Sequence, residues 1–454
     1  MSPKKIKFAI IALSTFMAAL DASIVNVSIP AIMESFQKGI DDVEWVVSAY
    51  MIAFAASMPL SGWIRERKGN LFIFSSSIAL FTVASFLCGS APSLPWLILA
   101  RILQAIGGGA IIPSAMAMIA EIFEPEERPH VLGWWGFVAI LGPSIGPTLG
   151  GVLTEHWGWP SIFYVNIPLG VILFFASQKF LKTHSSWQPS QNLFPWRSFL
   201  STSVFIISLL YLISLLLRVH WLHEKILISA SLLCLSGCIT FFDWKHQKPA
   251  IIDFHLLKNS LFLKSLSITF IRSMTLFGTV FLVPIFLQNA RGFSETHSGL
   301  ILLPASLVMG LCMPITGRFH SQIGAKNLIL CGGFFLIAYC FSSLLWSLTS
   351  SALFLSMILL LRGFGVGLMM TPTSTLAMNS VDTQKVGAAS SLINLVQHAA
   401  GALGVAIFSG IFEFLHFHQN SAEHILQAFQ GTMLVAGILN GSILAISLRL
   451  PKST

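Results

Sequence analysis

The chain has 454 residues, of which 55% are hydrophobic and only 10% are charged. An ordinary soluble domain carries about 25% charged residues, so this composition excludes a soluble globular protein and indicates an all-α integral membrane protein. The formal net charge of +8 is spread over short connecting segments, which excludes the concentrated basic patch of a nucleic-acid-binding protein.

Apolar segments long enough to cross a hydrocarbon core about 30 Å thick recur along the whole chain. They predict fourteen transmembrane helices, at residues 8–32, 43–64, 71–90, 95–119, 131–153, 161–181, 198–217, 225–243, 262–287, 298–316, 327–346, 352–376, 386–412 and 430–448. The first segment begins like a secretory signal peptide, but its apolar run continues through Asp21 to Pro30 and thirteen others follow. We therefore expect it to be retained as the first span.

Lysine and arginine are distributed unequally between alternate connecting segments. If the N-terminus is inside, the cytoplasmic segments hold 19 of the 26, the outer segments hold four, and three lie within the predicted spans. The positive-inside rule then predicts that both termini are cytoplasmic.

One acid stands out within the first span. Asp21 is the only acid in the middle of a predicted span, because Asp243 and Glu413 fall at span ends. Ionisable residues at the bilayer centre are candidates for function, and burial favours the protonated form of a carboxyl group. Asp21 is therefore our candidate proton carrier; the alternative is a passive polar residue in a water-filled vestibule.

The fifth span contains the run GPSIGPTLGG, which ends at Gly151. Gly142, Gly146 and Gly150 recur every four residues, so a helix would align them as a smooth groove for a neighbouring helix. Pro143 and Pro147 each remove a backbone donor from the helix. We interpret the run as a hinge; the alternative is an ordinary packing seam.

The two halves of the chain carry similar segments in the same order. Glycine-bounded basic segments start at Gly62 (GWIRERKGN) and Gly317 (GRFHSQIGAKN), an offset of 255 residues, and arginines precede glycine-rich runs at Arg101 and Arg362, an offset of 261. This register predicts an N-terminal six-helix half at 1–182, an inserted two-helix hairpin with connectors at 183–250, and a C-terminal six-helix half at 251–454. Parallel halves of this kind are typical of one large class of secondary transporters.

Several segments together resemble one family over essentially the whole chain. LDASIVNVSIP at 20–30, GWIRERKGN, RILQAIGGG, GPSIGPTLGG, IFYVNIPLG at 162–170, PIFLQNARGFSETHSGLILLP at 284–304 and GAASSLINLVQHAAGALG at 387–404 are similar to motifs of the major facilitator superfamily, in its fourteen-helix drug:proton antiporter branch. The resemblance implies a major facilitator fold with two pseudo-symmetric halves and six plus two plus six helices. It also implies that GPSIGPTLGG is the antiporter motif and that Arg101 lies near the first helix, where it could influence Asp21.

The basic segment after the second span is implied to be a cytoplasmic gating loop, with Gly62, Glu66, Arg67 and Gly69 as its key residues. Glu66 stands where the family usually has Asp, and Ser321 and Gln322 replace the acid–arginine pair in the second copy. The alternative for this loop is a plain topology signal.

Further polar residues are candidates to line a substrate cavity: Asn26, Gln104, Arg272, Gln288, Asn394 and His398. Polar residues in membrane helices also serve as interhelical contacts, and Arg272 and Arg362 are long enough to snorkel to an interface. No zinc-type spacing, phosphate-binding loop or nucleophile–base constellation occurs, so we expect no metal, no cofactor and no enzyme.

The resulting hypothesis is a proton-driven exporter of hydrophobic, cationic compounds in the bacterial inner membrane. Its expected partners are these substrates, protons, the lipid bilayer, and a periplasmic adaptor with an outer-membrane channel; nucleic acid is not among them. The alternatives are an exporter of a defined metabolite, siderophore or amino acid, a membrane receptor or scaffold, and a membrane-embedded enzyme.

Overall fold

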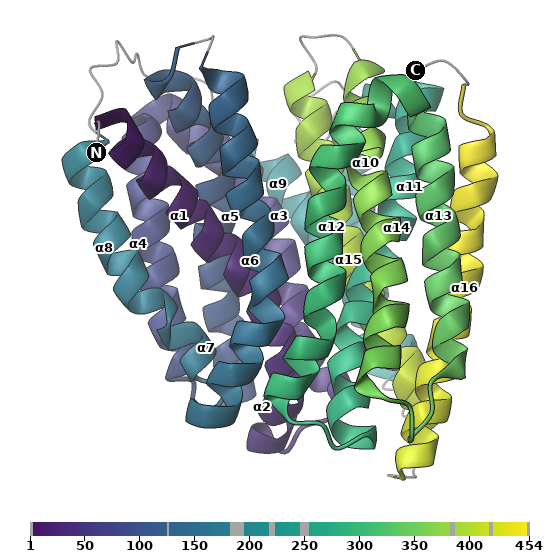
Figure 1. Cartoon of the computed structure of the whole chain (residues 1–454). Coiled ribbons are helices and arrows are strands. Elements are labelled where there is room, and N and C mark those ends of the chain that lie inside the picture. The colour runs from purple at the N-terminus through teal and green to yellow at the C-terminus, as the bar shows by residue number, and fades with distance from the viewer. Residues whose placement is uncertain are drawn as a thin grey trace. The chain divides into compact units, whose positions relative to one another are not determined.

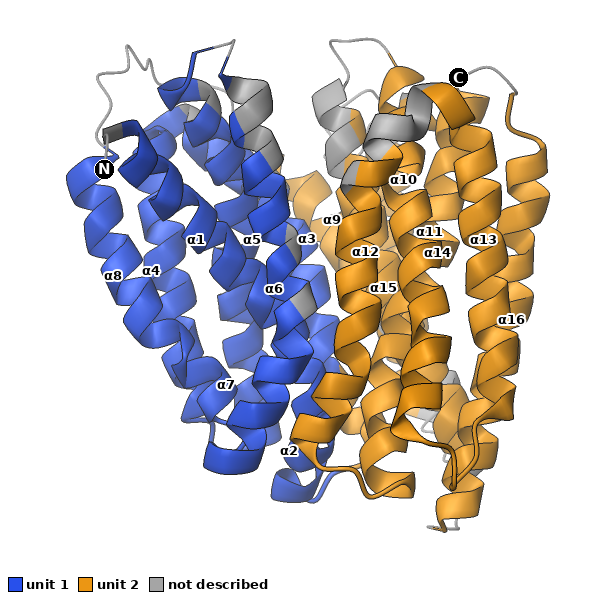
Figure 2. Cartoon of the chain, in the orientation of Figure 1, with its two compact units in different colours: residues 1–38, 45–194 blue, residues 39–44, 195–454 orange. Residues whose placement is uncertain are grey.

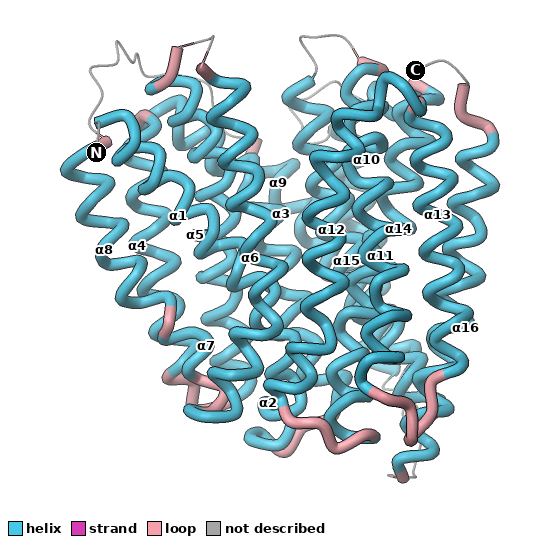
Figure 3. The backbone as a smooth tube through the Cα atoms, viewed as in Figure 1, coloured by secondary structure: helices cyan, strands magenta, loops and turns pink. Residues whose placement is uncertain are grey.

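The computed structural model describes residues 3–124, 127–181, 195–217, 223–245, 254–381, 386–416 and 421–451. These residues form helices joined by short loops, with no strand in any of the described ranges (Figure 3). Contacts divide the chain into two compact units, the first comprising residues 1–38 and 45–194 and the second residues 39–44 and 195–454 (Figure 2).

The helices of the first unit, α1 to α8, are labelled in Figure 1. They are α1 (Pro3–Ile24), the 3-10 turn η1 (Val25–Ser28), α2 (Ile29–Phe36), α3 (Ile40–Lys68), α4 (Asn70–Gly89), α5 (Leu94–Ile122), α6 (Arg128–Trp157), α7 (Ser161–Tyr164) and α8 (Asn166–Phe180). The first five residues of α3 belong to the second unit.

The second unit contains the remaining helices. They are α9 (Trp196–Leu217), α10 (His223–Lys245), the 3-10 turn η2 (Phe254–Lys258), α11 (Ser260–Ile285), the π-turn η3 (Phe286–Ala290), α12 (Glu295–Ile323), α13 (Ala325–Ser342), the 3-10 turn η4 (Ser343–Leu345), α14 (Ala352–Asn379), α15 (Val386–His416) and α16 (Ala422–Leu448).

Each of the fourteen predicted segments falls on helix. Within the described residues, twelve helices are long and apolar enough to cross a membrane, and thirteen if the two parts of the bent α6 are counted as one span. The described apolar part of α9, Trp196–Leu209, is shorter. The chain is therefore a multi-pass membrane protein, while the count of fourteen spans stays a prediction.

Glycines permit close packing inside each unit. In α5, a Cβ atom at Gly107 would lie 2.7 Å from the backbone nitrogen of Phe81 in α4. In α14, a Cβ atom at Gly367 would lie 2.9 Å from the carbonyl oxygen of Met309 in α12. The two glycine-rich runs that indicated a duplication therefore have the same structural role: each allows an arginine-bearing helix, α5 or α14, to pack closely against a neighbouring helix.

The hairpin of α9 and α10 lies in the second unit, where α9 packs against α15. Only 17% of the apolar window of α10 is buried, against 72% in α11. At the end of the hairpin, the buried carboxylate of Asp243 pairs with Nε of Arg197 at 3.3 Å. The exposed apolar side chains of α10, such as Leu227, Leu235 and Phe241, suit a helix that faces lipid.

Candidate functional site

Asp21 and Arg101 form a buried ion pair in the first unit. Nη1 of Arg101 lies 2.6 Å from Oδ2 of Asp21, and both side chains are at most 1% exposed. They come from α1 and α5, which the packing of the unit brings together. The structure thus places the two predicted proton-coupling residues in direct contact, 80 positions apart in sequence.

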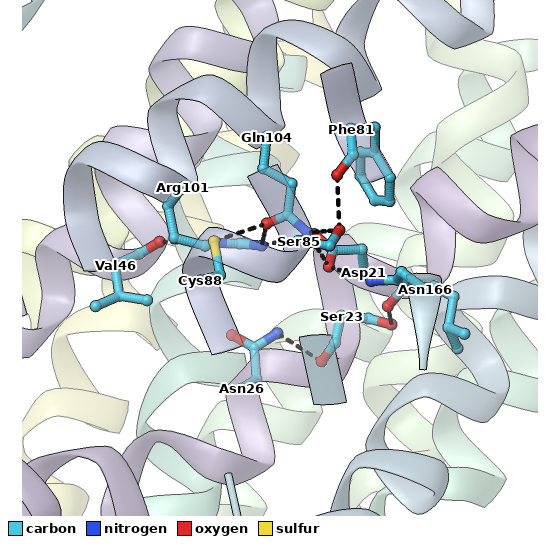
Figure 4. A network of polar contacts seen from close by, with 11 residues as sticks. Asp21, Ser23, Asn26, Val46, Phe81, Ser85, Cys88, Arg101, Gln104 and Asn166 are labelled. Carbon is cyan, nitrogen blue, oxygen red and sulfur yellow. Dashed lines mark hydrogen bonds and ion pairs between the residues drawn. The ribbon is translucent and has the colours of Figure 1, made fainter. Parts of the chain in front are cut away.

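Two amide side chains complete the shell of the carboxylate (Figure 4). Oδ1 of Asp21 accepts hydrogen bonds from Nε2 of Gln104 at 2.8 Å and from Nδ2 of Asn166 at 3.0 Å. Gln104 also donates to Oγ of Ser85 at 2.8 Å. Asp21 therefore receives three donors from two other helices, α5 and α8, and this shell is suited to its charged form.

Arg101 is held from several directions as well. Its Nε donates to the carbonyl oxygen of Val46 at 3.3 Å, and its Nη1 to Oε1 of Gln104 at 2.6 Å. The guanidinium carbon lies 3.8 Å from the ring centroid of Tyr50, a cation–π geometry. Because a guanidinium stays protonated, the group in this pair that can gain or lose a proton is the carboxyl group of Asp21.

Protonation of Asp21 would change the charge of this site from neutral to positive. The attraction between α1 and α5 would fall, because Arg101 would lose its counter-ion while it remains buried. A proton taken up by Asp21 would therefore weaken the contact between α1 and α5.

The glycine groove of α6 contacts α1 next to Asp21. A Cβ atom at Gly142 would lie 2.7 Å from the backbone nitrogen of Leu20, and one at Gly150 would lie 2.5 Å from the carbonyl oxygen of Ile24. A Cβ atom at Gly146 would collide with Oγ of Ser23. The run GPSIGPTLGG thus forms the surface against which the Asp21 segment of α1 rests.

The prolines of the same motif lie where α6 bends. Pro143 and Pro147 are both inside the helix, and α6 bends by 40° between its parts Trp134–Pro143 and Ile145–Trp157. A proline removes a backbone hydrogen bond and clashes with the preceding turn, which accounts for the bend. The motif therefore combines close contact with a bend, while its action as a hinge stays a prediction.

Residues that we assigned to a substrate cavity lie in both units. In the first unit, Gln104 belongs to the shell of Asp21, and Nδ2 of Asn26 donates to the carbonyl oxygen of Ser23 at 3.3 Å. In the second unit, Gln288 lies in η3, and Asn394 and His398 lie half-buried on α15. That these residues line one cavity stays a prediction.

Arg272 and Arg362 are buried inside the second unit, at 2% and 6% exposure. The alternative that they snorkel to an interface does not hold, because both lie more than two helical turns from the ends of α11 and α14 and their neighbours enclose them; that Arg272 lines a substrate cavity stays a prediction. Their surroundings differ from those of Arg101, since the described part of the second unit shows no salt bridge to either of them.

The segment from Gly62 to Lys68 is helix rather than the expected loop. The helix α3 continues to Lys68, and only Gly69, with φ of 84°, separates it from α4. Arg67 stacks over the ring of Trp63 at 4.6 Å, whereas the side chain of Glu66 lies outside the described residues. The glycine-bounded motif thus ends one helix and starts the next, and its gating role stays a prediction.

Sequence reasoning missed Asn166 and Ser85. Asn166 lies in the quoted run IFYVNIPLG, and it is the one amide side chain of the sixth predicted span before Gln178. An amide within an apolar run was the available signal, but it does not reveal a partner 145 residues away.

The membrane-capable helices and the ion pair buried among them define a polytopic membrane protein with a charged interior site. The profile of the Major Facilitator Superfamily matches residues 11–405, and the chain belongs to that superfamily, whose match identifies a transporter and not an enzyme.

Relatives support this assignment. The chain is 30% identical over 402 residues to the Multidrug resistance protein Stp of Mycobacterium tuberculosis (strain H37Rv), covering 88% of this chain and 74% of Stp. It is 28% identical over 425 residues to the Riboflavin transporter RibZ of Clostridioides difficile (strain 630), covering 93% and 92%. Its fold is similar to the crystal structure of a bacterial homologue of the human lysosomal transporter Spinster, with a TM-score of 0.71, 13% identity and coverage of 99% and 98%.

Proposed function

We propose that this transporter is a proton-coupled antiporter that exports hydrophobic drugs or toxic compounds. The observation that carries the proposal is the ion pair of Asp21 and Arg101, buried in the middle of the first unit. An ionisable pair is costly to bury inside a membrane helix bundle, so such a pair is a candidate for function. Asp21 is the member of this pair that can take up and release a proton.

The geometry also suggests how proton binding would be transmitted. Asp21 lies between Leu20 and Ser23, which contact Gly142 and Gly146 of the bent helix α6. A change in the position of α1 on protonation would therefore act directly on α6. Export of drugs, in turn, is supported by similarity to a protein named for multidrug resistance.

The sequence suggested a cationic substrate attracted by an anionic Asp21. The carboxylate already receives donors from Arg101, Gln104 and Asn166, so a cation would have to displace Arg101 to reach it. The core of the proposal is therefore export of hydrophobic compounds, and the charge of the substrate is a separate question.

A second candidate function is export or uptake of a defined metabolite. It is favoured by the similarity to a protein named as a riboflavin transporter, which extends over 92% of that protein's length. Both candidates use the same fold and the same driving force.

For location, we propose the bacterial inner membrane with both termini in the cytoplasm, which rests on the distribution of lysine and arginine. We further propose that the proton gradient drives transport without a cofactor, and that a periplasmic adaptor with an outer-membrane channel extends the pathway. Deletion of these accessory proteins should lower drug resistance of cells without lowering transport in vesicles.

The proposal is tested with purified protein in proteoliposomes that contain a pH-sensitive dye. Three probes share one ring system and differ in charge: pyrenebutyrate, pyrenebutanol and pyrenebutyl-trimethylammonium. Addition of a transported probe should move protons in the opposite direction in the wild type, after subtraction of the movement in protein-free liposomes, where pyrenebutyrate can carry protons inward as its neutral acid. Transport of any probe with no proton movement would contradict antiport.

A further inference from the structure

Among the described residues of the second unit, its two buried arginines have no acidic partner such as Asp21. Arg272 and Arg362 are 2% and 6% exposed, and within the described residues neither takes part in a salt bridge. Nε of Arg272 and Nη1 of Arg362 are buried with no hydrogen-bond partner in the described part of the chain. A buried cation that has no anionic partner and leaves a nitrogen without an acceptor is a costly arrangement, in contrast to the paired arginine of the first unit.

The internal duplication shows which residue replaces the acid. The offsets of 255 and 261 residues align Asp21 with the window 276–282, LFGTVFL, in which Thr279 is the one polar residue. Oγ1 of Thr279 donates to the carbonyl oxygen of Thr275 at 2.8 Å, within its own helix. The second unit therefore keeps the arginine of the duplicated site, Arg362, and lacks its carboxylate.

The described acids of the second unit all lie near helix ends. Asp243 is in the last turn of α10, where it pairs with Arg197. The others lie in the first two turns or the last turn of their helices: Asp41, Asp42, Glu44, Glu224, Glu295, Glu413 and Glu423. In the full sequence, Asp253 and Asp382 also lie outside the predicted spans. Each acid of the unit thus lies near a helix end or outside the predicted spans, and the buried one at the start of α3, Glu44, accepts a hydrogen bond from Ser409.

The two arginines lie on packed helices. α11 contacts α14, and Arg272, Thr275 and Thr279 lie on one stripe of α11 because they are three and seven residues apart. The guanidinium of Arg362 lies over the ring of Tyr339 of α13 at 5.9 Å. The structure thus places Arg362 beside Tyr339, and Arg272 on a polar stripe of α11, a helix that packs against α14.

We propose that Arg272, with Arg362 as a second cation on the neighbouring helix, binds the carboxylate of a hydrophobic organic anion. A guanidinium presents paired donors that match a carboxylate, and the ligand would supply the counter-charge that the described residues do not give to these two arginines. Arg272 lies about 18 Å along α11 from its first residue and Arg362 about 15 Å along α14, too deep for a lipid headgroup at the interface. The inference rests on the proposed export of hydrophobic compounds and assigns anions as their class.

The test is binding of the three pyrene probes to the purified full-length protein in phosphatidylcholine nanodiscs at low chloride, which requires no transport. The wild type should bind pyrenebutyrate at least tenfold more tightly than pyrenebutanol, and pyrenebutyl-trimethylammonium more weakly than either. Arg272→Gln should reduce the affinity for pyrenebutyrate to that for pyrenebutanol, and Arg272→Lys should retain part of the preference. Arg449→Gln, which removes an exposed arginine of the same unit, should change nothing.

A second readout separates binding from a structural role. Without ligand, Arg272→Gln should unfold at the same or a higher temperature, because it removes an uncompensated buried charge. A lower unfolding temperature together with unchanged preference for pyrenebutyrate would overturn the inference.

The source of the anion is tested by competition. Preference for pyrenebutyrate that disappears in millimolar chloride, or on addition of phosphatidylglycerol to the nanodiscs, would assign the site to an inorganic ion or a lipid and overturn it. A tighter affinity for the ammonium probe, with probe-driven proton movement intact, would overturn the anion site and leave antiport standing. Intact preference for pyrenebutyrate without proton movement would support the anion site and overturn antiport.

Discussion

Replacement of Gly146 by leucine tests the contact between α6 and α1. The Cβ atom alone would collide with Oγ of Ser23 and would lie 3.1 Å from Cβ of Ser23 and 3.2 Å from the backbone nitrogen of Ile24. The serine hydroxyl can rotate away, but the backbone of α1 cannot, so the three further carbons of leucine must push the two helices apart. Overpacking of this kind costs about 1–3 kcal/mol.

Two matched variants set the scale. Gly146→Ala adds only the Cβ atom, and its gain in helix propensity of about 0.5–1 kcal/mol offsets much of the crowding, so we expect nearly normal stability. Gly136→Leu changes the same helix at a position where a Cβ atom meets nothing within 4 Å, so we expect no loss.

The assay combines the free energy of unfolding in mixed micelles with probe-driven proton movement in proteoliposomes. Gly146→Leu should lose stability and most transport, because displacement of α1 also moves Asp21 away from Arg101. If Gly146→Leu matches Gly136→Leu in both measurements, the motif is not the contact surface that positions Asp21, and the reasoning fails.

Three other predictions concern the charges and the hairpin. Asp21→Asn should abolish probe-driven proton movement and destabilise the fold by at most about 3–5 kcal/mol, because it leaves Arg101 without its counter-ion. The double variant Asp21→Asn with Arg101→Gln should recover part of that stability. If the changes in the free energy of unfolding of the two single variants simply add in the double variant, the pair is not coupled. Asp243→Asn, which removes another buried carboxylate paired with an arginine, should leave proton movement intact, and equal loss in both variants would make the effect of Asp21→Asn non-specific. Cysteines introduced between Ser201 and Leu215 in α9 should react equally with and without bound probe, whereas a cysteine at Asn26 should be protected; protection in α9 would place the hairpin in the binding site.

The fold was predictable because the membrane simplifies it. An apolar run of sufficient length in lipid has little choice except a helix, and every predicted segment falls on one. The end of α3 was harder, because Gly62 and Gly69 suggested a loop, whereas the residues between them, WIRERK, include good helix formers and extend the helix to Lys68.

The ion pair was predictable in part for a similar reason. A charge within an apolar span is rare, so Asp21 and Arg101 stand out in the sequence. Uncharged Asn166 and Ser85 do not, because amides and hydroxyls are common in membrane helices. Which helices meet depends on tertiary packing, and no local pattern reports that Gln104 bridges Asp21 and Ser85.

The burial of the Arg272 and Arg362 side chains could not be predicted from the sequence. Their position within a span does not say whether the side chain reaches an interface or points into the bundle. The neighbouring helices decide this, and they enclose both side chains.

The central claim is that Asp21 couples proton movement to substrate movement, and counterflow in proteoliposomes tests it most directly. Counterflow exchanges labelled for unlabelled pyrene probe and requires alternating access but no net proton transfer. The account predicts that Asp21→Asn retains counterflow while it loses accumulation of probe driven by a pH gradient, with protein-free liposomes measuring passive entry. Accumulation by Asp21→Asn that still follows the pH gradient as in the wild type would contradict the account.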